Sequence, residues 1–202
     1  MRNIFFTSLA FLVLTSCSSF KAERQTSDQS DEKAMSVTDN WVDRDTETTV
    51  NDIIKQINDH KGFQRYQAQH QGKPSLFIAE IQNRTAEAYF PIDDLNNELL
   101  NKMSQTDDFV LVDAAARDKI LEEIKYQNDG MVDPSTAKSI GKQTGADLLI
   151  FGSVQMKPEM RDGKTVKQYS VDIRLTNLEK AVEVARTRSK IYKFSEKKTF
   201  GF

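Results

Sequence analysis

The sequence predicts an α/β fold in which a mixed sheet has a parallel βαβ part followed by an antiparallel meander, with helices packed on one or both faces. Three observations lead to this fold class. Residues 75–82 and 147–156 begin with runs that are apolar on both faces, as is typical of strands buried in a parallel sheet. Residues 168–176 alternate between apolar and polar, a period of two that indicates one buried and one solvated face. Apolar residues at helical spacing lie between these strands.

Helices and strands alternate in the first half of this domain. Apolar residues at helical spacing predict a helix over residues 49–59, and the Gln-rich residues 60–73 predict a loop or an extension of that helix. The strand at 75–82 follows. After Pro91, a stripe of large apolar residues predicts a helix over 93–104.

The next elements are expected to complete two crossovers between parallel strands. Residues 109–112, with the sequence FVLV, predict a short buried strand. Asp113 then caps a predicted helix that runs to about residue 127. Asp133 and Pro134 open another helix, which closes at Gly145.

The last third predicts an antiparallel meander. Asp162 and Gly163 form a dipeptide that is favoured in two-residue hairpin turns, so they join the strand at 147–156 to the strand at 168–176. Residues 182–194 predict a further antiparallel strand. One side of this meander is expected to face water.

The N-terminus predicts an export signal. A positive start precedes a short apolar run over residues 4–14, which as a helix would reach only about 16 Å against a hydrocarbon core of about 30 Å. The following Leu-Thr-Ser-Cys resembles the bacterial lipobox, which implies that residues 1–16 are removed and that Cys17 carries acyl chains. The alternative is an ordinary signal peptide with an incidental cysteine. Cys17 is the only cysteine, which excludes a disulfide within the chain.

Residues 17–48 predict a disordered tether. Between positions 21 and 48 there are eight acidic, four basic and four large apolar residues, too few of the last to offset the entropy of ordering. Position 18 is a serine, whereas an aspartate there would resemble an inner-membrane retention signal. The serine therefore favours the outer membrane. Residues 49–202 then fit a single α/β protein-binding domain.

The sequence offers no catalytic constellation, and neither a cofactor nor a metal is expected. There is no Gly-rich phosphate loop, no nucleophile elbow and no His/Cys cluster. The two histidines, His60 and His70, are interpreted as ordinary surface residues. A formal net charge of −2 argues against a dedicated nucleic-acid binder.

The order of motifs resembles a known family. AEIQNRT, a leucine-rich helix, DDFVLVDAAARDKI and SIGKQTGADLLIFGSV are similar to the LpoB family of outer-membrane lipoproteins, over roughly residues 76–192. The resemblance implies a fold similar to the N-terminal domain of TolB. It also implies docking onto a class A penicillin-binding protein, a bifunctional peptidoglycan synthase, and activation of that enzyme. The tether departs from the family's best-known members, because it is shorter and lacks proline.

A second function remains open at this point. TolB-like domains also occur in lipoproteins of outer-membrane export and trafficking, so the alternative is a component of an envelope assembly or secretion complex.

Two loops are candidate partner-binding sites. Asn83, Arg84 and Thr85 follow a predicted strand and either make a structural turn or meet a partner. Met131 and Val132 lie in a polar connection between predicted helices, which is either an ordinary loop or a contact site.

The last strand carries a basic stripe that is the third candidate. Arg186, Arg188 and Lys190 fall on one face at period two. The stripe is either a solvated face or protected sheet edge, or a patch that steers an acidic partner.

Overall fold

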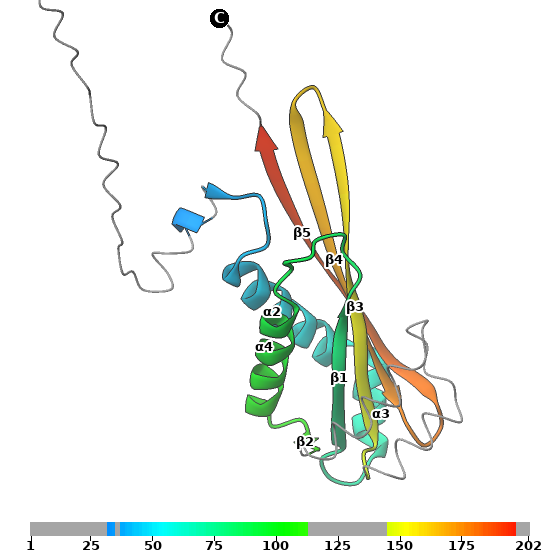
Figure 1. Cartoon of the computed structure of the whole chain (residues 1–202). Helices are drawn as coiled ribbons and strands as arrows, with labels where there is room; N and C mark the ends of the chain where they lie inside the picture. Colours follow the sequence, from blue (N-terminus) through cyan, green and yellow to red (C-terminus); the bar gives the residue numbers. More distant parts are fainter. Residues whose placement is uncertain (1–31, 35–36, 113–144, 197–202) are drawn as a thin grey trace, which may run out of the picture.

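The computed structural model describes residues 32–34, 37–112 and 145–196. Its centre is a five-stranded sheet in the order β2-β1-β3-β4-β5 (Figure 1). The expected α/β class is confirmed, because the sheet is parallel on one side and antiparallel on the other. The two helices predicted between residues 113 and 145 lie outside the described residues, except for Gly145.

The parallel part is built around β1, Ser75–Asn83. This strand pairs with the two-residue β2, Val110–Leu111, on one side and with β3, Leu148–Arg161, on the other. Both faces of β1 are buried at its start, as the continuous apolar run predicts. An irregularity in the register lies between Ile78 and Ile81.

The antiparallel part consists of long strands joined by tight turns. β3 pairs along its whole length with β4, Lys164–Asn177, which pairs with β5, Val182–Glu196. Asp162 and Gly163 have φ values of 51° and 75°, the left-handed conformation that a two-residue hairpin turn of this hand requires. The predicted hairpin is therefore confirmed.

Three described helices cover one face of the sheet: α2 (Asp43–Asp59), α3 (Lys61–Gln69) and α4 (Ile92–Gln105). Figure 1 shows α2 and α4 side by side against this face. Each contributes apolar side chains to the main core together with alternate residues of β1, β3 and β4. None of the helices among the described residues is long and apolar enough to cross a membrane.

The N-terminal boundary of the folded part differs from the sequence prediction. The helix expected to begin at residue 49 begins at Asp43, and Trp41 is buried, with 7% of its surface exposed. Residues 41–48 therefore belong to the packed domain and not to a disordered tether. The reason is tertiary: Trp41 packs between the rings of Phe90 and Tyr169, with centroids 5.1 and 5.2 Å away.

The segment after α2 also differs in detail. His60 has an extended backbone, which ends α2, and its imidazole Nδ1 accepts a hydrogen bond from the Gly62 amide at 3.1 Å. A separate helix, α3, starts there, where the sequence predicted a loop or a continuation of the first helix.

Candidate functional site

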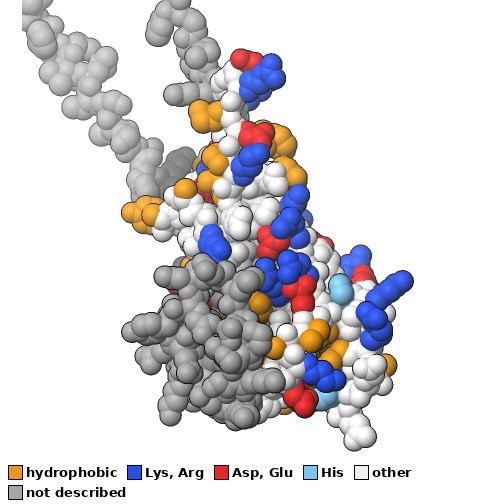
Figure 2. All heavy atoms as spheres, turned by 90° about the vertical axis from the view of Figure 1, so that its right-hand side faces the viewer, with side chains coloured by type: hydrophobic (Ala, Val, Ile, Leu, Met, Phe, Trp, Pro, Cys, Tyr) orange, Lys and Arg blue, Asp and Glu red, His pale blue; other side chains and the backbone are white. Residues whose placement is uncertain are grey.

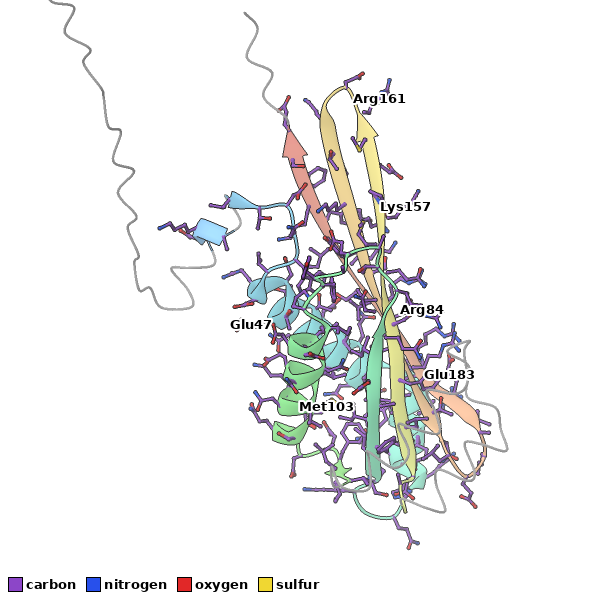
Figure 3. The ribbon with its side chains drawn as sticks, in the orientation of Figure 1. Glu47, Arg84, Met103, Lys157, Arg161 and Glu183 are labelled. Atoms are coloured by element: carbon purple, nitrogen blue, oxygen red, sulfur yellow. The ribbon has the colours of Figure 1, made fainter. Side chains whose placement is uncertain are left out.

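Four arginines line the face of the sheet opposite α2, α3 and α4; we call the surface formed by Arg84, Arg174, Arg186 and Arg188 the arginine face. They surround a shallow hollow of about 160 Å³ whose floor is the middle of β3 and β4. Figure 2 views the molecule from this side and shows Lys and Arg side chains interleaved with Asp and Glu along it. In Figure 3, Arg84 and Glu183 project on the side of the sheet away from Met103 of α4.

Strand register determines which side chains meet on this face. Residues opposite each other in antiparallel strands share a face at a Cβ separation of about 5 Å. Two such rows cross β3, β4 and β5: Ser153–Asp172–Arg188 and Phe151–Arg174–Arg186.

Two of the guanidinium groups are held by carboxylates. Arg188 Nε donates to Asp172 Oδ1 at 2.5 Å. Arg186 donates from Nε and Nη2 to the two oxygens of Glu183, at 2.9 and 2.6 Å. The hydrogen bond from Arg186 lowers the pKa of Glu183 from its ordinary value. Both arginine side chains stay more than half exposed, so these pairs orient the guanidinium groups and add little stability.

The other two arginines are held by uncharged groups. Arg174 lies over the ring of Phe151, 5.7 Å from its centroid, a cation–π contact. Arg84 donates from Nε and Nη2 to Gln82 Oε1, at 3.3 and 3.1 Å. Lys190 stands in the next row, opposite Ser170. The four arginines thus outnumber Asp172 and Glu183, the two carboxylates that hold Arg188 and Arg186.

The predicted site residues divide in the structure. Asn83 Oδ1 accepts hydrogen bonds from the amide and hydroxyl of Thr85, at 2.9 and 2.7 Å, so these two side chains stabilise a turn. Arg84, between them, joins the arginine face. Arg186, Arg188 and Lys190 are exposed on the predicted face. Cys17, Met131 and Val132 lie outside the described residues.

Sequence reasoning missed the partners of the basic stripe. Asp172 and Arg174 belong to the alternating strand β4, and Glu183 is the second residue of β5. Their polar positions on the solvated side were visible in the pattern. Glu183 and Arg186 lie three residues apart on β5 itself, whereas the contact between Asp172 and Arg188 depends on the register between β4 and β5. That register includes a shift between Leu175 and Thr176.

A second polar cluster, which we call the latch, joins the N-terminal segment to the sheet; it consists of Asp39, Trp41, Glu87, Lys167 and Tyr169. The buried Tyr169 hydroxyl donates to both oxygens of Glu87, at 2.9 and 2.8 Å. Lys167 Nζ lies 3.1 Å from Glu87 Oε1 and 3.1 Å from Asp39 Oδ1. The latch therefore ties together the start of the domain, the loop after β1 and the middle of β4.

The pKa values within the latch follow from burial and from these contacts. Burial, and then the hydrogen bond to Glu87, raise the pKa of Tyr169 far above its usual value, so its hydroxyl stays a donor. Burial alone would lower the pKa of Lys167, but hydrogen bonds to Glu87 and Asp39 outweigh it and raise the pKa. The hydrogen bond from Ser195 lowers the pKa of Asp39.

One arrangement near the start of β1 contains the residue types of a catalytic triad in a different order. Ser75 Oγ donates to Asp147 Oδ2 at 2.7 Å, and His70 Nε2 lies 3.7 Å from the same oxygen. In hydrolytic triads the imidazole lies between the hydroxyl and the carboxylate and takes the hydroxyl proton. Here the carboxylate lies between them, so the imidazole does not reach the hydroxyl. Asp147 also accepts from the Ser75 amide at 2.8 Å, and the contacts pin β1 to the start of β3.

A hollow of about 780 Å³ adjoins these residues, lined by Tyr66, His70, Asp147 and polar residues of the β4–β5 connection. Burial, and then the charge of Asp147, raise the pKa of Tyr66. Within the described ranges, no group of three or more His, Cys, Asp or Glu side chains is placed to hold a metal ion.

The profile of the family described as "Peptidoglycan-synthase activator LpoB" matches residues 45–190. The chain belongs to the LpoB family. The family name describes a regulator of peptidoglycan synthases, not an enzyme that carries out the synthesis. The match begins at Asp45, inside α2, in agreement with a domain that starts before residue 49.

Solved structures of LpoB proteins are similar to this chain. The NMR structure of Escherichia coli LpoB is 12% identical, with 96% of this chain and 86% of that chain covered and a TM-score of 0.49. The C-terminal domain of Escherichia coli LpoB is 14% identical, with coverages of 73% and 98% and a TM-score of 0.47. The same domain from Salmonella enterica is 13% identical, with coverages of 72% and 94% and a TM-score of 0.45. Among curated proteins, none matches the chain significantly in sequence.

Proposed function

We propose that this chain is an outer-membrane lipoprotein, anchored through acyl chains on Cys17, that binds a class A penicillin-binding protein and activates it. The family match supports a peptidoglycan synthase as the partner. The arginine face is the observation on which the docking surface in this proposal rests. The residues between Cys17 and Asp39 would connect the acylated cysteine to the packed domain and let the domain reach a synthase embedded in the opposite membrane.

The charge of the arginine face favours an acidic partner surface. Its arginines outnumber the carboxylates that hold them, and this positive charge would accelerate encounter with such a surface, an effect that salt weakens. Arginine is enriched in protein interfaces, because its planar guanidinium group both stacks and forms paired hydrogen bonds. Asp172, Glu183 and Phe151 already orient three of the four groups, which reduces the side-chain entropy lost on binding.

Activation requires that the domain bind the active arrangement of the synthase more tightly than the inactive one. A ligand shifts such an equilibrium only by its difference in affinity between the two states. Anchoring both proteins in facing membranes raises their effective concentration wherever the tether can span the distance. Activation would then occur only where outer membrane and synthase lie within reach of each other.

The test is synthesis of peptidoglycan from lipid II by a class A synthase, with and without the mature chain, together with measurement of the association rate. We expect the double substitution Arg84→Glu and Arg188→Glu to lower the association rate by about tenfold at low salt. Stimulation of the synthase should fall together with the association rate. The matched control is Lys55→Glu with Lys61→Glu. These substitutions reverse the same number of charges at two exposed lysines of α2 and α3.

Two outcomes would contradict different parts of the proposal. No complex and no change in glycan polymerisation or cross-linking with the parent chain would remove the synthase as the partner. If the two pairs of substitutions changed the association rate equally, with the same salt dependence, the synthase would remain the partner. The arginine face would then be excluded as its docking surface.

A further inference from the structure

β5 is one of the two edge strands of the described sheet, and its two halves differ in how the edge is covered. Figure 1 shows that β3, β4 and β5 rise beyond α2 and α4. The described contacts to the upper half of β5 are made on the helix face, where Asp45 contacts Lys193 and Asp39 contacts Ser195, and not along its open edge. Beside the lower half, Gln56 of α2 contacts the backbone of Arg188. Its amide nitrogen donates to the Arg188 carbonyl, and its amide oxygen accepts from the Arg188 amide, each at 3.1 Å.

This contact establishes which backbone groups of β5 point away from the sheet. Arg188 pairs with Asp172, and its own amide and carbonyl face outward to Gln56. In an antiparallel ladder, outward-facing groups recur at every second residue. Lys190, Tyr192, Phe194 and Glu196 therefore present their amides and carbonyls outward. Among the described residues, none of these outward groups has a hydrogen-bond partner.

The side chains at these positions are also open to association. Tyr192 and Phe194 are 50% and 74% exposed, and exposed apolar side chains beside an unpaired strand edge favour association. They stand on the face of the sheet opposite the helices. Natural proteins usually protect such an edge, and in this one Gln56 protects only the stretch that ends at Arg188.

The free stretch is complementary to itself. When two copies pair antiparallel about Lys193, Lys190 lies opposite Glu196 of the second copy, and Tyr192 lies opposite its Phe194. These are the residues with outward-facing backbone groups, so each opposed pair forms two ladder hydrogen bonds. Opposite charges and aromatic pairs both stabilise cross-strand neighbours.

Lys193, at the centre of that register, does not oppose the pairing. Its side chain turns to the helix face, where Nζ lies 2.6 Å from Asp45 and only 11% of the side chain is exposed. Each copy thus neutralises its own central lysine. The ladder also has a defined length, because Gln56 occupies the edge at Arg188 in both copies.

We propose that residues 190–196 of β5 pair edge to edge with the same residues of a second copy of this chain, forming a twofold-symmetric dimer with a continuous sheet. The partner is a second copy because the strand matches its own reverse in charge and in aromatic side chains. The inference is independent of the proposed synthase partner.

Disulfide trapping of the full chain in cell membranes tests the register. Two differently tagged copies carry Tyr192→Cys and Phe194→Cys, whose Cα atoms would lie about 5.5 Å apart in the dimer, within disulfide range. We expect the mixed pair to cross-link at least about fivefold more than either variant with itself, since those cysteines would be diagonal, about 7 to 8 Å apart. The parent chain, with Cys17 alone, and Met160→Cys at the exposed hairpin tip provide the backgrounds.

Exchange of the charged pair tests the contact itself. When both cross-linking copies also carry Lys190→Glu, a glutamate at position 190 of each copy lies opposite Glu196 of the other. These two like-charged pairs are expected to lower the cross-linking yield by about tenfold. Adding Glu196→Lys should restore it. Unchanged melting temperatures would show that the variants fold, as their exposed positions lead us to expect. A mixed yield no higher than the backgrounds, failed restoration, or adducts only with other proteins would overturn the dimer.

Discussion

Replacing Tyr169 with phenylalanine removes one hydroxyl from the latch and leaves the ring in place. Tyr169 is fully buried, with 0% of its surface exposed, and its hydroxyl donates to both carboxylate oxygens of Glu87. The variant keeps the packing of the ring against Trp41 and Phe90. Any loss of stability therefore reports on the hydrogen bonds and not on a cavity.

The size of the loss follows from the charge and exposure of the acceptor. A hydrogen bond to a charged group contributes roughly 1.5–3 kcal/mol. The Glu87 side chain is 21% exposed and keeps its contact with Lys167, so water can replace part of what is lost. We expect the free energy of unfolding to fall by about 2 kcal/mol. With an m-value of about 2 kcal/mol/M, the urea midpoint falls by about 1 M.

Equilibrium urea denaturation measures this, followed by fluorescence of the single tryptophan, Trp41, and by circular dichroism. Tyr89→Phe is the matched control: Tyr89 is 99% exposed and lies two residues from Glu87 in sequence, so its variant should unfold like the parent. In a double-mutant cycle with Glu87→Gln we expect a coupling of about 1 kcal/mol or more. A loss below about 0.5 kcal/mol for Tyr169→Phe, or no coupling, would refute the latch as a stabilising cluster.

Two further predictions concern the sheet and its response to acid. Gly152→Ala would place a Cβ 2.2 Å from the Asp172 backbone oxygen, so we expect the free energy of unfolding to fall by about 1–3 kcal/mol. Ser153→Ala is the control, and equal urea midpoints for the two variants would contradict the reasoning. Folding lowers the pKa of Asp39 below its ordinary 3.8, chiefly through Ser195, so the carboxylate stabilises the fold fully above about pH 5 and less as the pH falls through 4. The melting temperature of Asp39→Asn should therefore fall less between pH 6 and 3, whereas parallel curves would exclude this contribution.

Local patterns in the sequence were sufficient for several elements. The alternation over residues 168–176 predicted β4, and the Asp162-Gly163 dipeptide predicted its hairpin. The apolar stripe over residues 93–104 predicted α4 to within one residue at each end. Each of these signals depends on neighbours in sequence, because turn conformation and the faces of strands and helices are local properties.

The first helix shows where local reasoning ended. Residues 37–48 have the composition of a tether, yet Trp41 is buried and α2 begins at Asp43. The residues that hold this segment, Phe90, Lys167 and Tyr169, lie 49 to 128 positions further along the chain than Trp41. The segment's own composition could not offset the entropy lost when it becomes ordered. Packing against distant residues offsets that loss.

The sequence by itself determined that a strand near the C-terminus would carry a basic stripe on one face. Only the tertiary structure decided what that stripe became, by placing Asp172 and Arg174 of β4, and Arg84 from the turn after β1, next to Arg186 and Arg188. The physical reason is that a strand's own period sets which side chains share its face, whereas the register between strands sets which charges meet.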